Sequence, residues 1–238
     1  MSLMNRCMSM TASLSKRITA DSSKYHVSIS KNHYQHCNIR RELSGFSFAG
    51  PRNLNEIMKT ELLENKTKAE ISDIWMSYHE SKERVHGTVL KGSDGLKVLQ
   101  RAEKLPFFIE PIFRDDGFFM LLSQFQTPSH FLLAYLEDYK MDPNRAQPLL
   151  TFSIFNDMVE SHDISLLRCD VINKGIEESE GRKVMEFLVD CYKVEEEHEK
   201  WVKEFNEKPA TFDVDDYIAC MNQKWKRDDD EHVDDSTK

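Results

Sequence analysis

The residues able to perform acid–base, nucleophilic or metal chemistry are few and widely spaced in this sequence. His79-Glu80 is not followed by a second histidine four residues after the first, so it does not form the His-Glu-x-x-His zinc motif. We interpret His79 as a solvent-facing or capping residue. His198 lies on an apolar helical stripe and is interpreted as a core or rim histidine, while His162-Asp163 is interpreted as a turn. None of these histidines predicts a metal site.

The cysteines form no recognisable redox or metal motif. Cys169, Cys191 and Cys220 are an odd number, widely spaced and without a Cys-x-x-Cys pair. This pattern predicts reduced core thiols rather than a disulfide framework or a zinc site. Cys169 could act as a thiol nucleophile with a distant histidine. However, Arg168 and Asp170 would point to the opposite face of a strand from it.

Phosphate-binding and hydrolase motifs are also missing. The sequence has no GxxxxGK[ST], GxGxxG or GxSxG, and Gly92-Ser93-Asp94-Gly95 lacks the following lysine and a suitable preceding strand. Arg114-Asp115-Asp116-Gly117 could bind a cation or form a salt bridge across a turn, but the turn is the simpler interpretation. From the residues alone we expect no catalytic residue, no cofactor and no metal, which favours binding over catalysis.

Two apolar, aromatic runs within residues 105–125 flank this Arg-Asp-Asp-Gly segment and organise the predicted core. Asp-Gly is a strong hairpin signal, because a tight turn needs positive φ values that these residues tolerate. Pro106 and Pro111 cannot donate to a strand ladder, so the first strand is expected at an edge or interrupted. Seven of the fourteen phenylalanines lie between Phe107 and Phe131, so the main core is expected here.

The remaining elements predict an α+β fold. Helical stripes begin at Leu54 and after Thr67, which opens a Thr-x-x-Glu capping box. Strands are expected at residues 85–90, 130–136, 149–152 and 163–171, and helices at 96–104, at 153–160 with Ser153 as cap, and in three stretches after Asn173. This order predicts a mainly antiparallel or mixed sheet of about five or six strands covered by helices, with an N-terminal helical pair and C-terminal helices.

Charge divides the chain. Residues 1–48 contain seven Lys/Arg and two acidic residues, which leaves 25 basic against 39 acidic residues in the rest. The basic, hydroxyl-rich N-terminus is typical of a mitochondrial transit peptide, and the alternative is a merely disordered basic segment. The acidic remainder argues against nucleic-acid binding, because no excess of basic residues is left to contact phosphates.

The domain organisation follows from these boundaries. We expect a transit peptide at 1–48, a single α+β domain at 49–226 with the helical pair at 49–82, and a disordered acidic tail at 227–238. No apolar run approaches the ~20 residues needed to span a bilayer, so we expect a soluble protein without membrane insertion.

Beyond these patterns, the order of segments resembles the mitochondrial ATP synthase assembly factor family that acts on the beta subunit of the catalytic head. The resemblance covers about residues 54–192. It rests on Leu-Asn-Glu-Ile-Met-Lys at 54–59, Ile74-Trp75 with Tyr78-His79, Pro-Phe-Phe-Ile-Glu-Pro at 106–111, Arg114-Asp115 with Gly117, Leu-Leu-Ser-Gln-Phe at 121–125, Leu-Glu-Asp-Tyr-Lys at 136–140 and Ile-Ser-Leu-Leu-Arg at 164–168.

The resemblance implies a non-enzymatic chaperone of the mitochondrial matrix, monomeric when free. It would bind the unassembled beta subunit, prevent its aggregation and promote assembly of the alpha/beta hexamer. An unpartnered subunit exposes a large interface, which is an aggregation hazard. Two alternatives remain open: a small-molecule enzyme that uses His, Cys or Asp residues, and a nucleotide-binding regulator of the matrix.

The expected partner surface combines the helical pair with the hairpin. The alternative for the apolar members of this set is simple core packing. The six residues are Ile57, Leu62, Trp75, Tyr78, Arg114 and Phe118.

Overall fold

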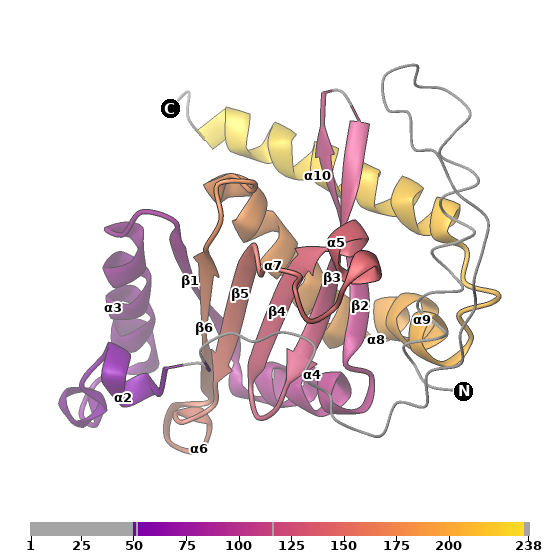
Figure 1. Cartoon of the computed structure of the whole chain (residues 1–238). Coiled ribbons are helices and arrows are strands. Elements are labelled where there is room, and N and C mark those ends of the chain that lie inside the picture. Colours follow the sequence, from indigo (N-terminus) through magenta and orange to yellow (C-terminus); the bar gives the residue numbers. More distant parts are fainter. Residues whose placement is uncertain (1–49, 51, 116, 236–238) are drawn as a thin grey trace.

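The computed structural model describes residues 50, 52–115 and 117–235 as an antiparallel sheet with helices packed on it (Figure 1). The expected transit peptide at 1–48 lies outside these residues. Within the described part of the chain, no helix combines the length and apolar character needed to cross a membrane.

The sheet has six strands in the order β1-β6-β5-β4-β3-β2, and every neighbouring pair is antiparallel. The α+β class is therefore confirmed, and the sheet is antiparallel rather than mixed. The strands are β1 (Val85–Lys91), β2 (Phe107–Arg114), β3 (Gly117–Gln126), β4 (His130–Tyr135), β5 (Leu150–Phe155) and β6 (Ile164–Val171).

The aromatic hairpin is confirmed as β2 and β3. Arg114 pairs with Gly117, and Gly117 has a φ of 142°, which side-chain-bearing residues rarely adopt. Asp116 lies outside the described residues. β2 is an edge strand, as Pro106 and Pro111 predict. In Figure 1 the tip of this hairpin rises beyond the neighbouring strands, and α10 (Val214–Asp235) runs past it.

One expected helix is wrong. Ser153 does not cap a helix, because it lies inside β5, opposite His130 of β4 and Arg168 of β6. Pairing with β4 reaches Ser153 and pairing with β6 extends β5 to Phe155, and only the short α6 (Val159–His162) precedes β6. A short helix, α5 (Leu136–Met141), follows β4.

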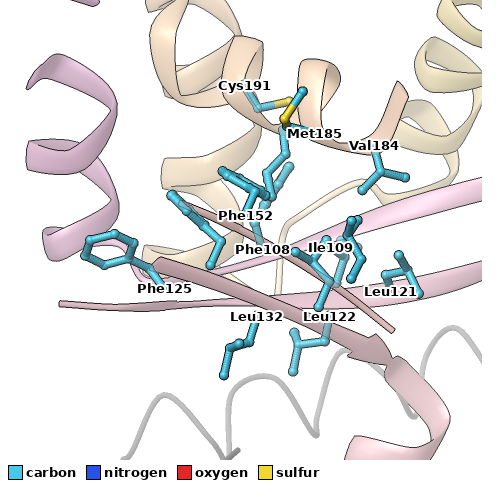
Figure 2. Packing of buried hydrophobic residues seen from close by; sticks show 14 of the residues in the cluster. Phe108, Ile109, Leu121, Leu122, Phe125, Leu132, Phe152, Val184, Met185 and Cys191 are labelled. Carbon is cyan, nitrogen blue, oxygen red and sulfur yellow. The ribbon is translucent and has the colours of Figure 1, made fainter. Parts of the chain in front are cut away.

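Successive side chains of a strand point to opposite faces, and the larger helices pack on one of them, here called the α7 face. It is covered by α4 (Gly92–Lys104) and α7 (Glu178–Lys193), with α9 (Glu204–Glu207) and α10 over β2. Figure 2 shows Phe108 and Phe152 of the sheet directed towards Met185 and Cys191 of α7. All four side chains are buried.

Two glycines allow close packing on this face. A Cβ atom added to Gly95 of α4 would lie 2.1 Å from the Ser165 Oγ, and one added to Gly181 of α7 would lie 2.4 Å from the Val171 Cγ2. Both contacts are with β6, so a single strand sets the height of two helices above the sheet. The Cys169 Sγ lies 3.7 Å from the Gly181 carbonyl oxygen.

The N-terminal helical pair forms α2 (Leu54–Ile57), the 3-10 turn η2 (Thr60–Leu63) and α3 (Lys68–Glu80). Thr67 and Glu70 make the predicted capping box. These elements cover the opposite face, here called the α3 face, at its β1–β6 end. Their second, smaller core contains Leu54, Leu63, Ile71, Trp75, Phe155, Met158, Ile164 and Leu166.

The C-terminal part is helical, as expected, but it extends further. A continuous helical stretch comprises α8 (Glu195–Glu197), the π-helical η3 (His198–Lys203) and α9, and α10 follows. The tail expected to be disordered from residue 227 instead continues α10 as far as Asp235. The Lys183 Nζ lies 3.1 Å from an Asp228 carboxylate oxygen, which fixes this turn of the helix against α7.

The N-terminal helices yield a first testable prediction. Trp75→Ala should lower the free energy of unfolding by about 3–5 kcal/mol, because it empties a large buried site. It also removes the 2.9 Å hydrogen bond from the indole N–H to the Leu167 carbonyl. Urea denaturation measures the change, with the exposed Ile74→Ala on the same helix as control. Unchanged stability of Trp75→Ala would show that the ring does not belong to the core.

Candidate functional site

The six residues expected to contact a partner differ widely in exposure. Leu62, Tyr78 and Phe118 expose 71%, 38% and 37% of their surface, and Ile57 is half-buried. Trp75 is fully buried, so its expected exposure is wrong. The reason is that its stripe faces the sheet. Core packing, the alternative, is therefore the structural role of Trp75.

His79 is also buried, so of the two interpretations, solvent-facing or capping, the solvent-facing one is wrong and the capping one agrees with its place in the last turn of α3. Its Nδ1 lies 2.7 Å from the Trp75 carbonyl oxygen. Its ring covers Gly87 of β1, where an added Cβ would lie 2.6 Å from the imidazole. Burial lowers the pKa of His79. The imidazole therefore belongs to the packing between α3 and the sheet.

The expected surface is not brought together in one place. α3 packs beside β1, whereas Arg114 and Phe118 belong to the β2–β3 hairpin at the other edge, so three strands, β6, β5 and β4, lie between the two groups. Within the helical pair, Leu62 lies in η2, before α3 begins. Tyr78 lies near the end of α3, about 15 Å along the helix axis from its first residue, Lys68. The structure thus offers separate apolar positions rather than one continuous patch.

Arg114 is a tether as well as a surface residue. Its guanidinium donates two hydrogen bonds to the Glu180 carboxylate, at 2.7 and 2.8 Å, and a third to the Gly175 carbonyl at 2.9 Å. Glu180 is buried in the first turn of α7. This paired geometry joins the hairpin tip to α7, so Phe118 is the more available residue at that end.

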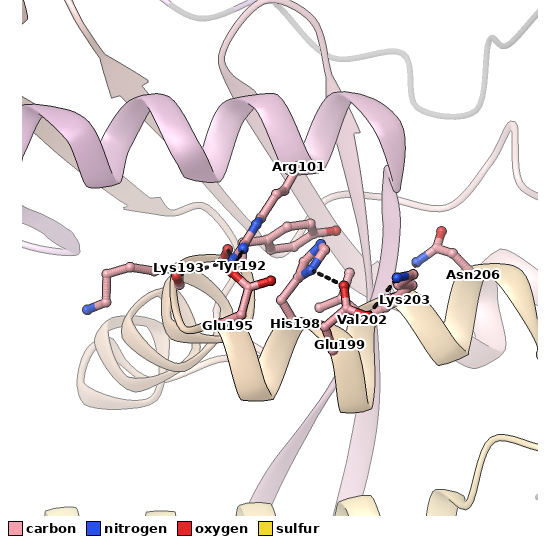
Figure 3. Close-up of polar contacts among 9 residues, drawn as sticks. All are labelled: Arg101, Tyr192, Lys193, Glu195, His198, Glu199, Val202, Lys203 and Asn206. Carbon is pink, nitrogen blue, oxygen red and sulfur yellow. Dashed lines mark hydrogen bonds and ion pairs between the residues drawn. The ribbon is translucent and has the colours of Figure 1, made fainter.

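A polar cluster that the sequence does not predict lies where α4 meets the end of α7 (Figure 3). Arg101 of α4 donates to the backbone carbonyls of Tyr192 and Lys193, at 2.8 and 3.2 Å, and forms an ion pair with Glu195. A cation at these last carbonyls is favourable for a helix C-terminus. The partners lie about ninety positions from Arg101, so no local sequence signal could identify the contact.

His198 lies in the same cluster and confirms the interpretation of a core or rim histidine. It exposes only 7% of its surface. Its Nδ1 lies 3.8 Å from an oxygen of Glu199, whose other oxygen accepts a 2.6 Å hydrogen bond from Lys203. Burial, together with the nearby Arg101 charge, lowers the pKa of His198. The imidazole is thus held in its neutral form near pH 7.

The thiols of Cys169 and Cys191 are deeply buried, whereas that of Cys220 is partly buried. Burial raises the pKa of the Cys169 and Cys191 thiols well above the ordinary range, and thiols in such surroundings are poor nucleophiles. His130 and Ser153 are in contact at 2.8 Å across β4 and β5, but both are buried. Burial lowers the pKa of His130 to about 4. These groups are placed for packing rather than for contact with a substrate in solution.

Glu110 of β2 is a carboxyl group inside the core. It is fully buried, and among the described residues neither of its side-chain oxygens has a hydrogen-bond partner. The nearby Tyr217 hydroxyl donates instead to the Ile109 carbonyl, at 2.9 Å. Burial raises the pKa of Glu110 to about 8, opposed by Tyr217 and Lys224 and reinforced by Glu197. A neutral carboxyl is therefore the form that suits the fold.

This carboxyl group predicts a pH-dependent stability. The folded state holds the proton up to about pH 8, whereas the unfolded chain releases it near 4.5. The contribution of Glu110 to the free energy of unfolding is therefore at its full value below pH 4.5, and it is lost as the pH rises towards 8. Glu110→Gln carries no proton that can be released, so its free energy of unfolding should not show this loss. The free energy of unfolding of the variant should therefore exceed that of the natural chain by a few kcal/mol at pH 9.

Urea denaturation at pH 5, 7 and 9 measures this difference. The matched control is Glu103→Gln, which changes an exposed carboxylate on α4. Parallel pH dependences for the natural chain and Glu110→Gln would contradict a buried neutral carboxyl.

Comparison of this sequence with known proteins identifies a matching family and similar proteins. A family model described as "ATP11 protein" matches residues 9–218. The chain is 22% identical over 177 residues to the "ATP synthase mitochondrial F1 complex assembly factor 1" of Danio rerio, covering 74% of this chain and 58% of that protein. It is 24% identical over 178 residues to the protein of the same name from Mus musculus, covering 74% and 54%.

The chain spans a little over half the length of these curated relatives. The family model, in contrast, matches most of the chain, including the sheet, α7 and the first turn of α10. On this match the chain belongs to the ATP11 protein family.

Proposed function

We propose that this chain is a mitochondrial assembly factor for the F1 part of ATP synthase. The observation that supports this most strongly is the family match over residues 9–218, together with two curated relatives that are named F1 complex assembly factors. On this proposal the chain acts by binding rather than by catalysis, in agreement with the burial of the Cys169 and Cys191 thiols and of the His130–Ser153 pair.

The finer proposal concerns the partner and the compartment. The chain binds the unassembled beta subunit in the matrix, acts as a monomer when free, and prevents aggregation until the alpha subunit takes its place. A subunit without its partner exposes an obligate interface, which is larger and more apolar than an ordinary surface. A protein that covers it temporarily needs moderate affinity, because it must leave when the hexamer forms.

The residues proposed to contact the partner are the exposed ones at the two ends of the sheet. Leu62, Tyr78 and the half-buried Ile57 serve the helical end, and Phe118, held by the Arg114 tether, serves the hairpin end. Isolated apolar side chains of this kind are common on protein surfaces. A partner that uses both ends must therefore span the sheet.

Capture experiments test the partner. The tagged chain is incubated with a mitochondrial matrix extract depleted of assembled ATP synthase, and the bound proteins are identified. We expect free beta subunit without alpha subunit, because the assembled interface would exclude the factor. Recovery of neither subunit would overturn the assembly role. Recovery of alpha alone would keep the role and replace the proposed partner.

Substitutions at each end test the surface. Leu62→Ala and Phe118→Ala should each weaken binding of the beta subunit about tenfold, which corresponds to about 1.4 kcal/mol and is the effect of a contact that contributes clearly to binding. Leu62→Ala should change the free energy of unfolding by no more than about 0.5 kcal/mol, as for other surface changes. Phe118→Ala should lower it by about 0.5–1.5 kcal/mol, because the Phe118 ring packs against that of Phe113. The matched control is Met141→Ala, at an 85%-exposed position on α5. If only one end responds, the other does not belong to the interface, and if neither responds the surface is elsewhere.

A further inference from the structure

Three potential metal ligands lie together beside the end of α7. Glu195, His198 and Glu199 each offer one ligand atom, and these atoms all lie within 4.8 Å of one another. The residues stand at i, i+3 and i+4 of one continuous helical stretch, so their side chains share a face. Figure 3 shows them next to Arg101 and Lys203. Exposed carboxylates are common on helices without a bound ion, so support for a metal site must come from the surroundings of His198.

His198 is an unsatisfied buried ligand. It is more than nine-tenths buried, and in the part of the chain that the structure describes neither ring nitrogen has a hydrogen-bond partner. Leaving buried polar atoms unpaired costs stability. The Nδ1 is directed towards Glu199, whose nearest oxygen is 3.8 Å away, too far for a hydrogen bond. The imidazole is thus placed beside two carboxylates with neither ring nitrogen engaged in a hydrogen bond among the described residues.

The neighbouring cations leave room for an ion. Lys203 occupies Oε2 of Glu199 at 2.6 Å, and it is Oε1 of that carboxylate that faces the imidazole. Arg101 pairs with Oε2 of Glu195 and leaves the other oxygen of that carboxylate. Carboxylates that bind metals are commonly held in this way by outer hydrogen-bond donors. The two positive charges also repel a dication, so we expect modest affinity.

The ligand set selects the kind of ion. Calcium and magnesium prefer sites made of oxygen ligands, whereas one imidazole nitrogen and two carboxylate oxygens suit zinc with an open fourth position. Ligands about 2.1 Å from a tetrahedral zinc ion lie about 3.4 Å apart. The 3.8 Å between His198 and Glu199 needs only a small contraction to reach this value. His198 also begins the π-helical segment η3, and such segments are frequent at functional sites.

We propose that Glu195, His198 and Glu199 form a binding site for a zinc-class divalent metal ion at the junction of α7 and α8. An ion there would cross-link successive turns of the helical stretch. Through the Arg101–Glu195 pair it would also reinforce the contact of α4 with the end of α7. The proposal rests on this cluster alone and is independent of the assembly role.

Titration of the metal-free full chain with zinc chloride, followed by calorimetry, tests this site. Residues 1–48 contain further histidines and cysteines, so the quantity that matters is the difference between variants. His198→Gln and Glu199→Gln should each lose one equivalent of zinc, or bind it at least tenfold more weakly. Glu196→Gln, which changes an exposed carboxylate in the same helical turn, should bind zinc as the natural chain does.

Thermal unfolding without and with zinc completes the test. Zinc should raise the melting temperature of the natural chain and of Glu196→Gln, and should not raise that of Glu199→Gln. Glu199 is half-exposed, so its replacement should not disturb folding. Equal zinc stoichiometry and affinity in all variants would mean adventitious binding elsewhere in the chain and would overturn the proposal.

Discussion

The close approach of α4 and α7 to strand β6 is the constraint on which the main layer of the protein depends. It exists because Gly95 and Gly181 have no side chain where Ser165 and Val171 lie, at 2.1 and 2.4 Å from an added Cβ. With both helices resting on one strand, Arg101 of α4 can reach the last carbonyls of α7. The polar cluster at that junction is thus a consequence of the close packing of two helices on β6, which the two glycines allow.

The parts of the fold that could be predicted are those whose signal is local. The capping box at Thr67 and the hairpin around Gly117 depend on residues within a few positions of each other, and both are found. Ser153 shows the opposite case. Its hydroxyl suits a helix cap, but pairing with His130 and Arg168 keeps it in β5. Whether a short segment becomes strand or helix was decided there by partners remote in the sequence.

The candidate sites were harder to predict for the same reason. A stripe of apolar residues indicates that a helix has a buried side, but not which neighbour it meets, so Trp75 was expected on a surface and lies in the core. α3 and the hairpin are separated because β1 and β2 lie at opposite edges of the sheet, and no local sequence pattern indicates this strand order. Glu110 was accessible to sequence reasoning, since it is a carboxylate in an otherwise apolar strand.

The hairpin surface and the C-terminal helix form one packed unit. The exposed ring of Phe118 lies 5.8 Å from the ring of Phe113, which lies 5.9 Å from Trp225 of α10. α10 in turn places Tyr217 beside Glu110, the core carboxyl group. Phe118 is the most exposed member of this aromatic series, which continues into the core. Trp225, which packs on Phe113, and Tyr217, which lies beside Glu110, both belong to α10, so the hairpin surface and the core carboxyl group share one supporting helix.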